Sequence, residues 1–182
     1  PHGRTAAVCV WPRFAAFARA RLPAAVRVAA VANFPDGSPD AERALRDTRA
    51  IVDAGAQEVD VVLPYRNLGT APALLAAVRR AAEGLTLKVI LETGELGSYE
   101  MVRLASMVAM AAGSDFIKTS TGKLPVGATA PVALCMAEAI REFADQTGVE
   151  VGLKLAGGIR TSKQALGYLA LGSYHRLVTR SN

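Results

Sequence analysis

The sequence predicts an α/β fold built on a parallel sheet, because short apolar runs alternate with amphipathic stretches along its 182 residues. The apolar runs are rich in Val, Ile and Leu, and several are apolar almost without interruption, which is typical of strands buried on both faces. The strand-then-helix order repeats six times and indicates βαβ units. A closed (β/α)8 barrel of the TIM type contains eight such units in about 250 residues. We therefore expect a barrel of this type that is incomplete, with about six βα units.

The predicted elements follow one another without a linker or a low-complexity tract. Strands are expected at residues 6–10, 27–32, 58–63, 87–92, 115–118 and 151–154. Helices are expected at residues 13–21, 40–54, 72–83, 99–112 and 131–146, and a last helix begins near residue 162. Ser38-Pro39 predicts an N-cap followed by a first-turn proline, and residues 161–164 fit a capping box. Four glycines follow helical stretches, as left-handed C-terminal caps would: Gly55, Gly84, Gly113 and Gly148.

The composition is that of a single soluble domain, which we place at residues 1–182. Hydrophobic residues make up 51% and charged residues 20%, and no apolar run reaches the 18 or so residues of a membrane span. The formal charge is +5, but the basic residues are scattered without interleaved aromatics, so we expect no nucleic-acid partner. A small phosphorylated substrate suits a mildly basic protein. Cys9 and Cys135 lack metal-ligand spacing, which predicts free thiols, no metal site and a cytoplasmic location.

Charged and polar residues lie within or at the end of five of the apolar runs. They are Asn33, Asp60, Glu92, Lys118 and Lys154. Charges at such positions are costly unless they are paired or functional. In a parallel barrel, functional residues gather at the carboxyl ends of the strands. We therefore expect the active site at that end.

Lys118 and Lys154 are the most informative of these residues. A lysine amine attacks a carbonyl only when it is unprotonated, and the reference pKa of about 10.4 leaves little free amine at neutral pH. Burial and a second cation nearby both disfavour the protonated form. Asp60 adds a carboxylate that relays protons or orients an ammonium. The pattern predicts Schiff-base chemistry; the alternative is a buried Lys–Asp ion pair that only ties strands together.

Gly157 and Gly158 follow the Lys154 strand and precede the capped helix. Glycines let backbone N–H groups approach an anion, and the start of a helix favours negative charge. The pair predicts a phosphate site, and the alternative is a simple tight turn.

Six segments, in order, resemble deoxyribose-phosphate aldolase, a class I aldolase family with a TIM barrel fold. They are Ala-Val-Cys-Val-Trp-Pro (7–12), Val-Ala-Asn-Phe-Pro-Asp-Gly (31–37), Glu-Val-Asp-Val-Val-Leu-Pro-Tyr-Arg (58–66), Lys-Val-Ile-Leu-Glu-Thr-Gly-Glu-Leu (88–96), Asp-Phe-Ile-Lys-Thr-Ser-Thr-Gly-Lys (115–123) and Lys-Leu-Ala-Gly-Gly-Ile-Arg-Thr (154–161). The resemblance implies reversible cleavage of 2-deoxy-D-ribose 5-phosphate to glyceraldehyde 3-phosphate and acetaldehyde, without a metal or other cofactor.

The resemblance also assigns roles to individual residues. It makes Lys118 the Schiff-base lysine, Lys154 the second lysine that perturbs it, and Asp60 part of the proton relay. Thr121 and Lys123 match residues that line the substrate channel. Gly157 and Gly158 match part of the phosphate site, and Cys9 matches a strand-end cysteine near the pocket, with a small core residue as the alternative reading.

Three departures from the family pattern qualify these expectations. The family's first strand and its eighth strand, whose Gly and Ser residues complete the phosphate site, have no counterpart here, and residues 172–182 form an atypical tail. Leu155 also stands where the family usually has proline. An opened barrel would expose two strand edges, so it either pairs with another copy as a homo-oligomer or is unstable alone. The alternatives left open are a weakly active or inactive aldolase-like fragment and a related Schiff-base aldolase with another substrate.

Overall fold

The computed structural model describes residues 5–174, and its six strands form one parallel sheet in chain order from β1 to β6. The strands are β1 (Ala7–Val10), β2 (Arg27–Ala32), β3 (Glu58–Val62), β4 (Thr86–Ile90), β5 (Phe116–Lys118) and β6 (Gly152–Lys154). Every neighbouring pair is parallel. The structure therefore confirms the predicted α/β fold with about six βα units.

The helices connect successive strands. They are α1 (Ala15–Arg19), α2 (Ala41–Asp53), α3 (Ala71–Ala81), α4 (Tyr99–Ala111), α5 (Ala130–Thr147) and α6 (Ser162–Tyr174). Three short 3-10 helices precede α1, α3 and α4, at Pro12–Phe14, Leu68–Thr70 and Thr93–Glu95. The helix predicted over 13–21 is thus shorter than expected. Its C-terminal end is held by the Arg19 guanidinium, which donates to the carbonyls of Leu22, Pro23 and Val26.

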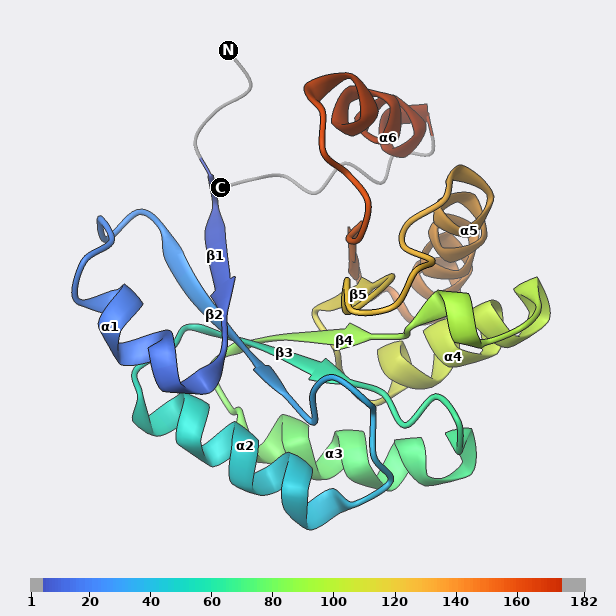
Figure 1. Ribbon diagram of the computed structural model, residues 1–182. Helices are drawn as coiled ribbons and strands as arrows, with labels where there is room; N and C mark the ends of the chain where they lie inside the picture. The colour runs from blue at the N-terminus through green and yellow to red at the C-terminus, as the bar shows by residue number, and fades with distance from the viewer. Residues whose placement is uncertain (1–4, 175–182) are drawn as a thin grey trace.

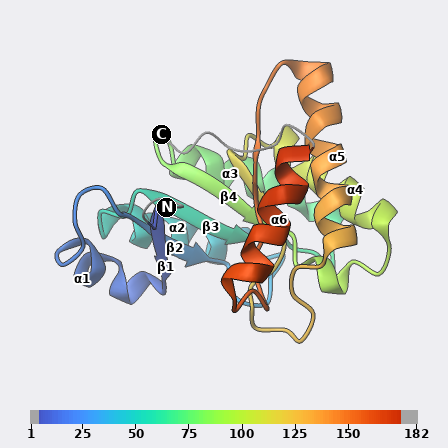
Figure 2. The ribbon, with the colours of Figure 1, turned by 90° about the horizontal axis from the view of Figure 1, so that it is seen from above.

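The sheet curls into part of a barrel, with the helices on its outer side (Figures 1 and 2). Val59, Val61, Leu87 and Val89 are fully buried and belong to the apolar core that packs with the helices. Side chains alternate between the faces of a strand, so Glu58 and Asp60 point the other way. Groups on β1, β5 and β6 all reach Asp60 on β3, which is possible only across the concave face. The polar side chains of the strands therefore meet inside the curl.

Most of the predicted helix ends agree with the structure. Gly55, Gly84, Gly113 and Gly148 all have positive φ, and Gly148 is itself the left-handed C-cap of α5. The capping box is present, because the Gln164 N–H donates to Thr161 Oγ1 and the Thr161 N–H donates to Gln164 Oε1.

The helix predicted over 40–54 agrees with α2, but its predicted N-cap was wrong by two residues. Asp40, rather than Ser38, is the N-cap, and its carboxylate accepts from the Arg43 N–H at 3.1 Å. Ser38 Oγ instead accepts from the Asp40 N–H and shapes the turn before the helix.

The last helix extends into the segment that the sequence sets apart as a tail. Residues 172–174 belong to α6, and the rest of the predicted tail over 172–182 lies outside the described residues. Within residues 5–174, no helix is both long enough and apolar enough to cross a membrane.

Candidate active site

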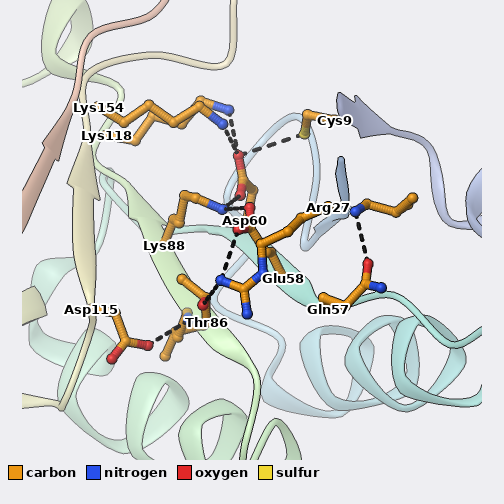
Figure 3. A network of polar contacts seen from close by, with 12 residues as sticks. Cys9, Arg27, Gln57, Glu58, Asp60, Thr86, Lys88, Asp115, Lys118 and Lys154 are labelled. Carbon is orange, nitrogen blue, oxygen red and sulfur yellow. Dashed lines mark hydrogen bonds and ion pairs between the residues drawn. The ribbon is translucent and has the colours of Figure 1, made fainter. Parts of the chain in front are cut away.

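Asp60 is the centre of a group of charged side chains on the concave face of the sheet (Figure 3). It lies in the middle of β3 and is completely buried. Its Oδ2 atom is 2.8 Å from Lys118 Nζ and 2.7 Å from Lys154 Nζ. Lys118 ends β5 and Lys154 ends β6, and the two residues are directly opposite in the strand register. The three predicted catalytic residues therefore come together, and both lysines share one carboxylate oxygen.

The electrostatics of this group follow from its burial and its charges. Burial alone would raise the pKa of Asp60, but the ammonium groups of Lys118, Lys154 and Lys88 outweigh it and hold that pKa well below its ordinary value. Burial lowers the pKa of Lys154, but the Asp60 carboxylate outweighs it, so that the pKa of Lys154 is raised. At neutral pH, Asp60 is therefore ionised and Lys154 is protonated.

Two further members of the group, Lys88 and Glu58, were not among the predicted site residues. Lys88 on β4 is paired in register with Asp60, and its Nζ is 3.2 Å from Asp60 Oδ1. The same Nζ forms a close ion pair with Glu58 Oε2, and both side chains are only 7% exposed. The signal for Lys88 was a charged residue inside an apolar run, facing the strand that carries Asp60.

Cys9 on β1 contacts Asp60 from the side opposite the two lysine strands. Its Sγ is 3.5 Å from Asp60 Oδ2, although the residue as a whole is exposed. The partial enclosure of the thiol and the nearby Asp60 carboxylate raise the pKa of Cys9, against the opposing effect of the lysines. Of the two readings of Cys9, the structure favours a place beside the lysine pair over one in the apolar core, and its thiol stays protonated at neutral pH.

Asn33 and Glu92 take a different role from the lysines, although both follow strands. Each is fully buried in a left-handed conformation with φ of 52°. The Asn33 amide donates to the carbonyls of Ser38 and Val62. Glu92 accepts from the backbone N–H and the hydroxyl of Thr121. These two residues therefore hold the loops of the rim and do not join the charged group around Asp60.

Thr121 and Lys123 lie on the loop between β5 and α5. The Thr121 hydroxyl donates to Glu92 and accepts from the Lys123 N–H at 3.1 Å. Thr121 thus shapes this loop. The Lys123 side chain is exposed, and within residues 5–174 it forms no ion pair, which leaves its charge available at the rim.

Gly157 and Gly158 form the turn between β6 and α6, with φ of 85° and 80°. A Cβ at Gly157 would be 2.9 Å from Gly127 Cα, so the loop after β5 packs closely on this turn. The Ala128 N–H donates to the carbonyls of Ala156 and Gly157. Among the described residues, neither glycine N–H has an acceptor. The turn therefore offers two free donors just before the N-terminus of α6.

Within residues 5–174, no three His, Cys, Asp or Glu side chains gather so that they could hold a metal ion. A surface hollow of about 450 Å³ is lined by Arg103, Cys135, Glu142 and neighbouring residues of α4 and α5. It lies in the outer helix layer, away from Asp60. The charged groups on the concave face are amines and carboxylates within reach of one another, which can exchange protons.

Known proteins share both the sequence and the fold. The family model described as DeoC/LacD family aldolase matches residues 2–171. A solved structure of a candidate deoxyribose-phosphate aldolase from Coccidioides immitis is 30% identical with a TM-score of 0.84, and the match covers 91% of this chain and 66% of that chain. A second candidate deoxyribose-phosphate aldolase, from Toxoplasma gondii, is 25% identical with a TM-score of 0.84, over 95% of this chain and 73% of that one. A deoxyribose phosphate aldolase from Aeropyrum pernix, described as a unique tetramer, is 25% identical with a TM-score of 0.77, over 90% and 68% of the two chains. This chain thus spans between 66% and 73% of the length of these relatives.

Proposed function

Because the chain belongs to the DeoC/LacD family of aldolases, we propose that it reversibly cleaves 2-deoxy-D-ribose 5-phosphate through a Schiff base on Lys118. The products are D-glyceraldehyde 3-phosphate and acetaldehyde. The observation that supports this most is the meeting of Lys118 and Lys154 on one oxygen of Asp60. The relatives named as deoxyribose-phosphate aldolases support the choice of substrate.

Lys118 is the better nucleophile of the two lysines. Its side chain is 7% exposed, whereas that of Lys154 is 31% exposed. Two ammonium groups on one carboxylate oxygen repel each other, and a desolvated lysine beside a second cation is a setting in which lysines act as nucleophiles. Lys154 keeps its proton, because Asp60 raises its pKa. The free amine is therefore assigned to Lys118, and Lys154 is the neighbouring acid.

The reaction then follows from these positions. The Lys118 amine adds to the C1 aldehyde of the open-chain sugar, and loss of water gives a protonated imine. The C3 hydroxyl loses its proton, the bond between C2 and C3 breaks, and its electron pair moves toward the imine to leave an enamine. The enamine carbon takes a proton, and hydrolysis releases acetaldehyde. Lys154 is placed to give and take these protons, directly or through water, while Asp60 holds it beside Lys118.

The phosphate of the substrate fits the turn before α6. The free N–H groups of Gly157 and Gly158 and the first turn of α6 supply donors and a favourable dipole for an anion. Lys123 on the neighbouring loop would add a positive charge. We place the phosphate there, with the sugar chain directed toward Lys118.

The test is turnover of 2-deoxyribose 5-phosphate by the purified protein, followed as acetaldehyde release. We expect turnover by the wild type and none by K118M, whereas R103Q, which changes an exposed ion pair on α4, should match the wild type. Equal rates in wild type and K118M would contradict the assignment. Turnover of other aldehydes and ketones with no reaction of deoxyribose 5-phosphate would keep the Schiff base but replace the substrate.

Two wider properties of the chain are proposals as well. We propose a homo-oligomer, because one relative is a tetramer and the outer edges of β1 and β6 have no strand partner within residues 5–174. Light scattering after size exclusion measures this directly, and a monomer across the micromolar range would contradict it. A single partial barrel domain in the cytoplasm remains our proposal for organisation and location.

A further inference from the structure

Beneath the lysine pair lies a second buried ion pair, Lys88 with Glu58, that the reaction steps above do not use. We propose that Lys88 is a positioning residue, which Glu58 holds in place and which turns Asp60 Oδ2 toward Lys118 and Lys154. In addition, its charge sets how readily the pair of lysines releases a proton. The catalytic meaning of this inference rests on the proposed function, but its geometric and electrostatic content does not.

The positions of the atoms around Asp60 support this role. Lys88 Nζ contacts Oδ1 at 3.2 Å, while Lys118 and Lys154 contact Oδ2 at 2.8 and 2.7 Å. Each carboxylate oxygen therefore has its own partners, on opposite sides of the group (Figure 3). A carboxylate held at both oxygens cannot turn without breaking ion pairs in a buried setting. Lys88 thus fixes the orientation in which Oδ2 is available to the two lysines.

Glu58 in turn holds Lys88. It lies two residues before Asp60 on β3 and therefore on the same face of the sheet. Its Oε2 pairs with Lys88, and its Oε1 is 3.4 Å from Arg27 Nη1 on β2. Arg27 also donates to the Thr86 hydroxyl on β4 at 3.1 Å. These contacts therefore link three adjacent strands, β2, β3 and β4, and restrict the movement of the Lys88 side chain.

The number of charges gives the pair a second effect. Three lysines and two carboxylates form the centre of the group, in which Lys154 alone is partly exposed, whereas Arg27 is half exposed and is screened by solvent. Removing the positive charge of Lys88 would balance the group, so Lys118 and Lys154 would hold their protons more firmly. Removing the negative charge of Glu58 would increase the positive excess, so one proton would leave more easily. The two changes should therefore act in opposite directions.

A purely structural role for the pair makes a different prediction. If Lys88 and Glu58 only tied β3 to β4, then removing either partner would destabilise the protein, because it leaves a buried charge unpaired. It would lower the amount of folded protein but would not move the pH at which the amine becomes reactive. The pH profile therefore separates positioning from simple bracing.

The experiment measures this profile in K88Q, E58Q, the double variant K88Q/E58Q, K88R and the wild type, with R103Q as a control for the loss of an exposed charge. The rate of imine formation with acetaldehyde is followed by cyanoborohydride trapping between pH 5 and 10. In parallel, acylation of Lys118 by acetic anhydride is read by peptide mass spectrometry, which needs no aldolase activity.

We expect the midpoint of both profiles to move up by about one pH unit in K88Q and down by a similar amount in E58Q. R103Q should match the wild type, and K88R should keep the wild-type midpoint because it keeps the charge. The double variant should return to near the wild-type midpoint, because its net charge is unchanged, but should trap imine about tenfold more slowly at its plateau. That loss would report the released Asp60 carboxylate.

Unchanged midpoints, or shifts in the same direction in K88Q and E58Q, would overturn the electrostatic part of the inference. A double variant with the full wild-type plateau would overturn the positioning part. If K88Q does not fold, E58Q and the double variant, whose net charge equals that of the wild type, still decide the electrostatic part and the positioning part. If the wild type forms no imine while acylation shifts as expected, then the proposed function fails and the role of Lys88 stands.

Discussion

Replacing Asp60 by Asn is the perturbation with the largest expected effect on this protein. The side chain keeps its shape but loses the charge that three lysine ammonium groups share, at 2.7 to 3.2 Å. Asp60 is completely buried, so solvent cannot replace what is lost. Breaking a buried ion pair by removing one partner costs about 3–5 kcal/mol. Since a domain is typically stable by about 5–15 kcal/mol, D60N should lose about a fifth or more of its free energy of unfolding.

The pH dependence of that loss follows from the directions of the pKa shifts. The pKa of Asp60 is lowered on folding, so its contribution to wild-type stability is full above the unfolded value of about 3.9 and disappears as the pH falls below it. The pKa of Lys154 is raised on folding, so its contribution is full below about 10.4 and disappears as the pH rises above it. In D60N, buried ammonium groups without a carboxylate release protons more readily than in the unfolded chain. Stability of the variant should therefore rise between pH 7 and pH 10, and the difference from the wild type should narrow.

Urea unfolding of both proteins at pH 5, 7 and 10 measures these differences. D36N is the matched control, because Asp36 forms an exposed ion pair with Arg43 and should contribute less than about 1 kcal/mol. A D60N loss as small as that of D36N, or one that stays constant from pH 7 to pH 10, would refute the account of the charged group.

Three further outcomes are expected. K118M should abolish reductive trapping of acetaldehyde, whereas K154M should still trap it about 10²–10⁴ times more slowly, as shown by mass spectrometry; full trapping in K118M would contradict this. G157A should lower the free energy of unfolding, measured in urea, by about 2–3 kcal/mol, and G158A by about 1 kcal/mol. Both glycines have positive φ, but only at Gly157 would a Cβ meet another backbone segment. A larger loss in G158A than in G157A would contradict this reasoning. Q164A should lower stability by about 0.5–1 kcal/mol in thermal melts, and an unchanged melting temperature would mean that the capping box contributes nothing.

The order of strands and helices could be predicted from the sequence because the strands of this sheet are apolar nearly throughout. A buried parallel strand such as Arg27–Ala32, which is apolar at every position after the first, stands out against the amphipathic helices. The ends were less certain. Ser38 and Asp40 can both cap a helix, and only the backbone geometry shows that Asp40 does so.

Only part of the candidate site could be predicted, because the backbone conformation at each strand end decides whether a polar side chain enters the site. Asn33 and Glu92 gave the same signal as the lysines, a polar residue after an apolar run. Their left-handed conformations turn them into the rim loops, where they hold the backbone. No pattern of residue types distinguishes these positions from the ends of β5 and β6, where Lys118 and Lys154 remain extended and reach inward.

Lys88 belongs to the site although it was not predicted as a site residue. Its charge lies inside an apolar run and not at a strand end. The register of β3 and β4 pairs it with Asp60, and register in a parallel sheet depends on the packing of whole strands. The charge of Lys88 can therefore be read from the sequence, but its neighbour Asp60 cannot.

Reductive trapping at Lys118 tests the central claim most directly. The protein is incubated with acetaldehyde and borohydride, digested, and its peptides are analysed by mass spectrometry. The account predicts one added ethyl group on Lys118, lost in K118M. Ethylation that is confined to Lys154, or spread evenly over exposed lysines such as Lys123, would contradict the assignment of Lys118 as the Schiff-base residue.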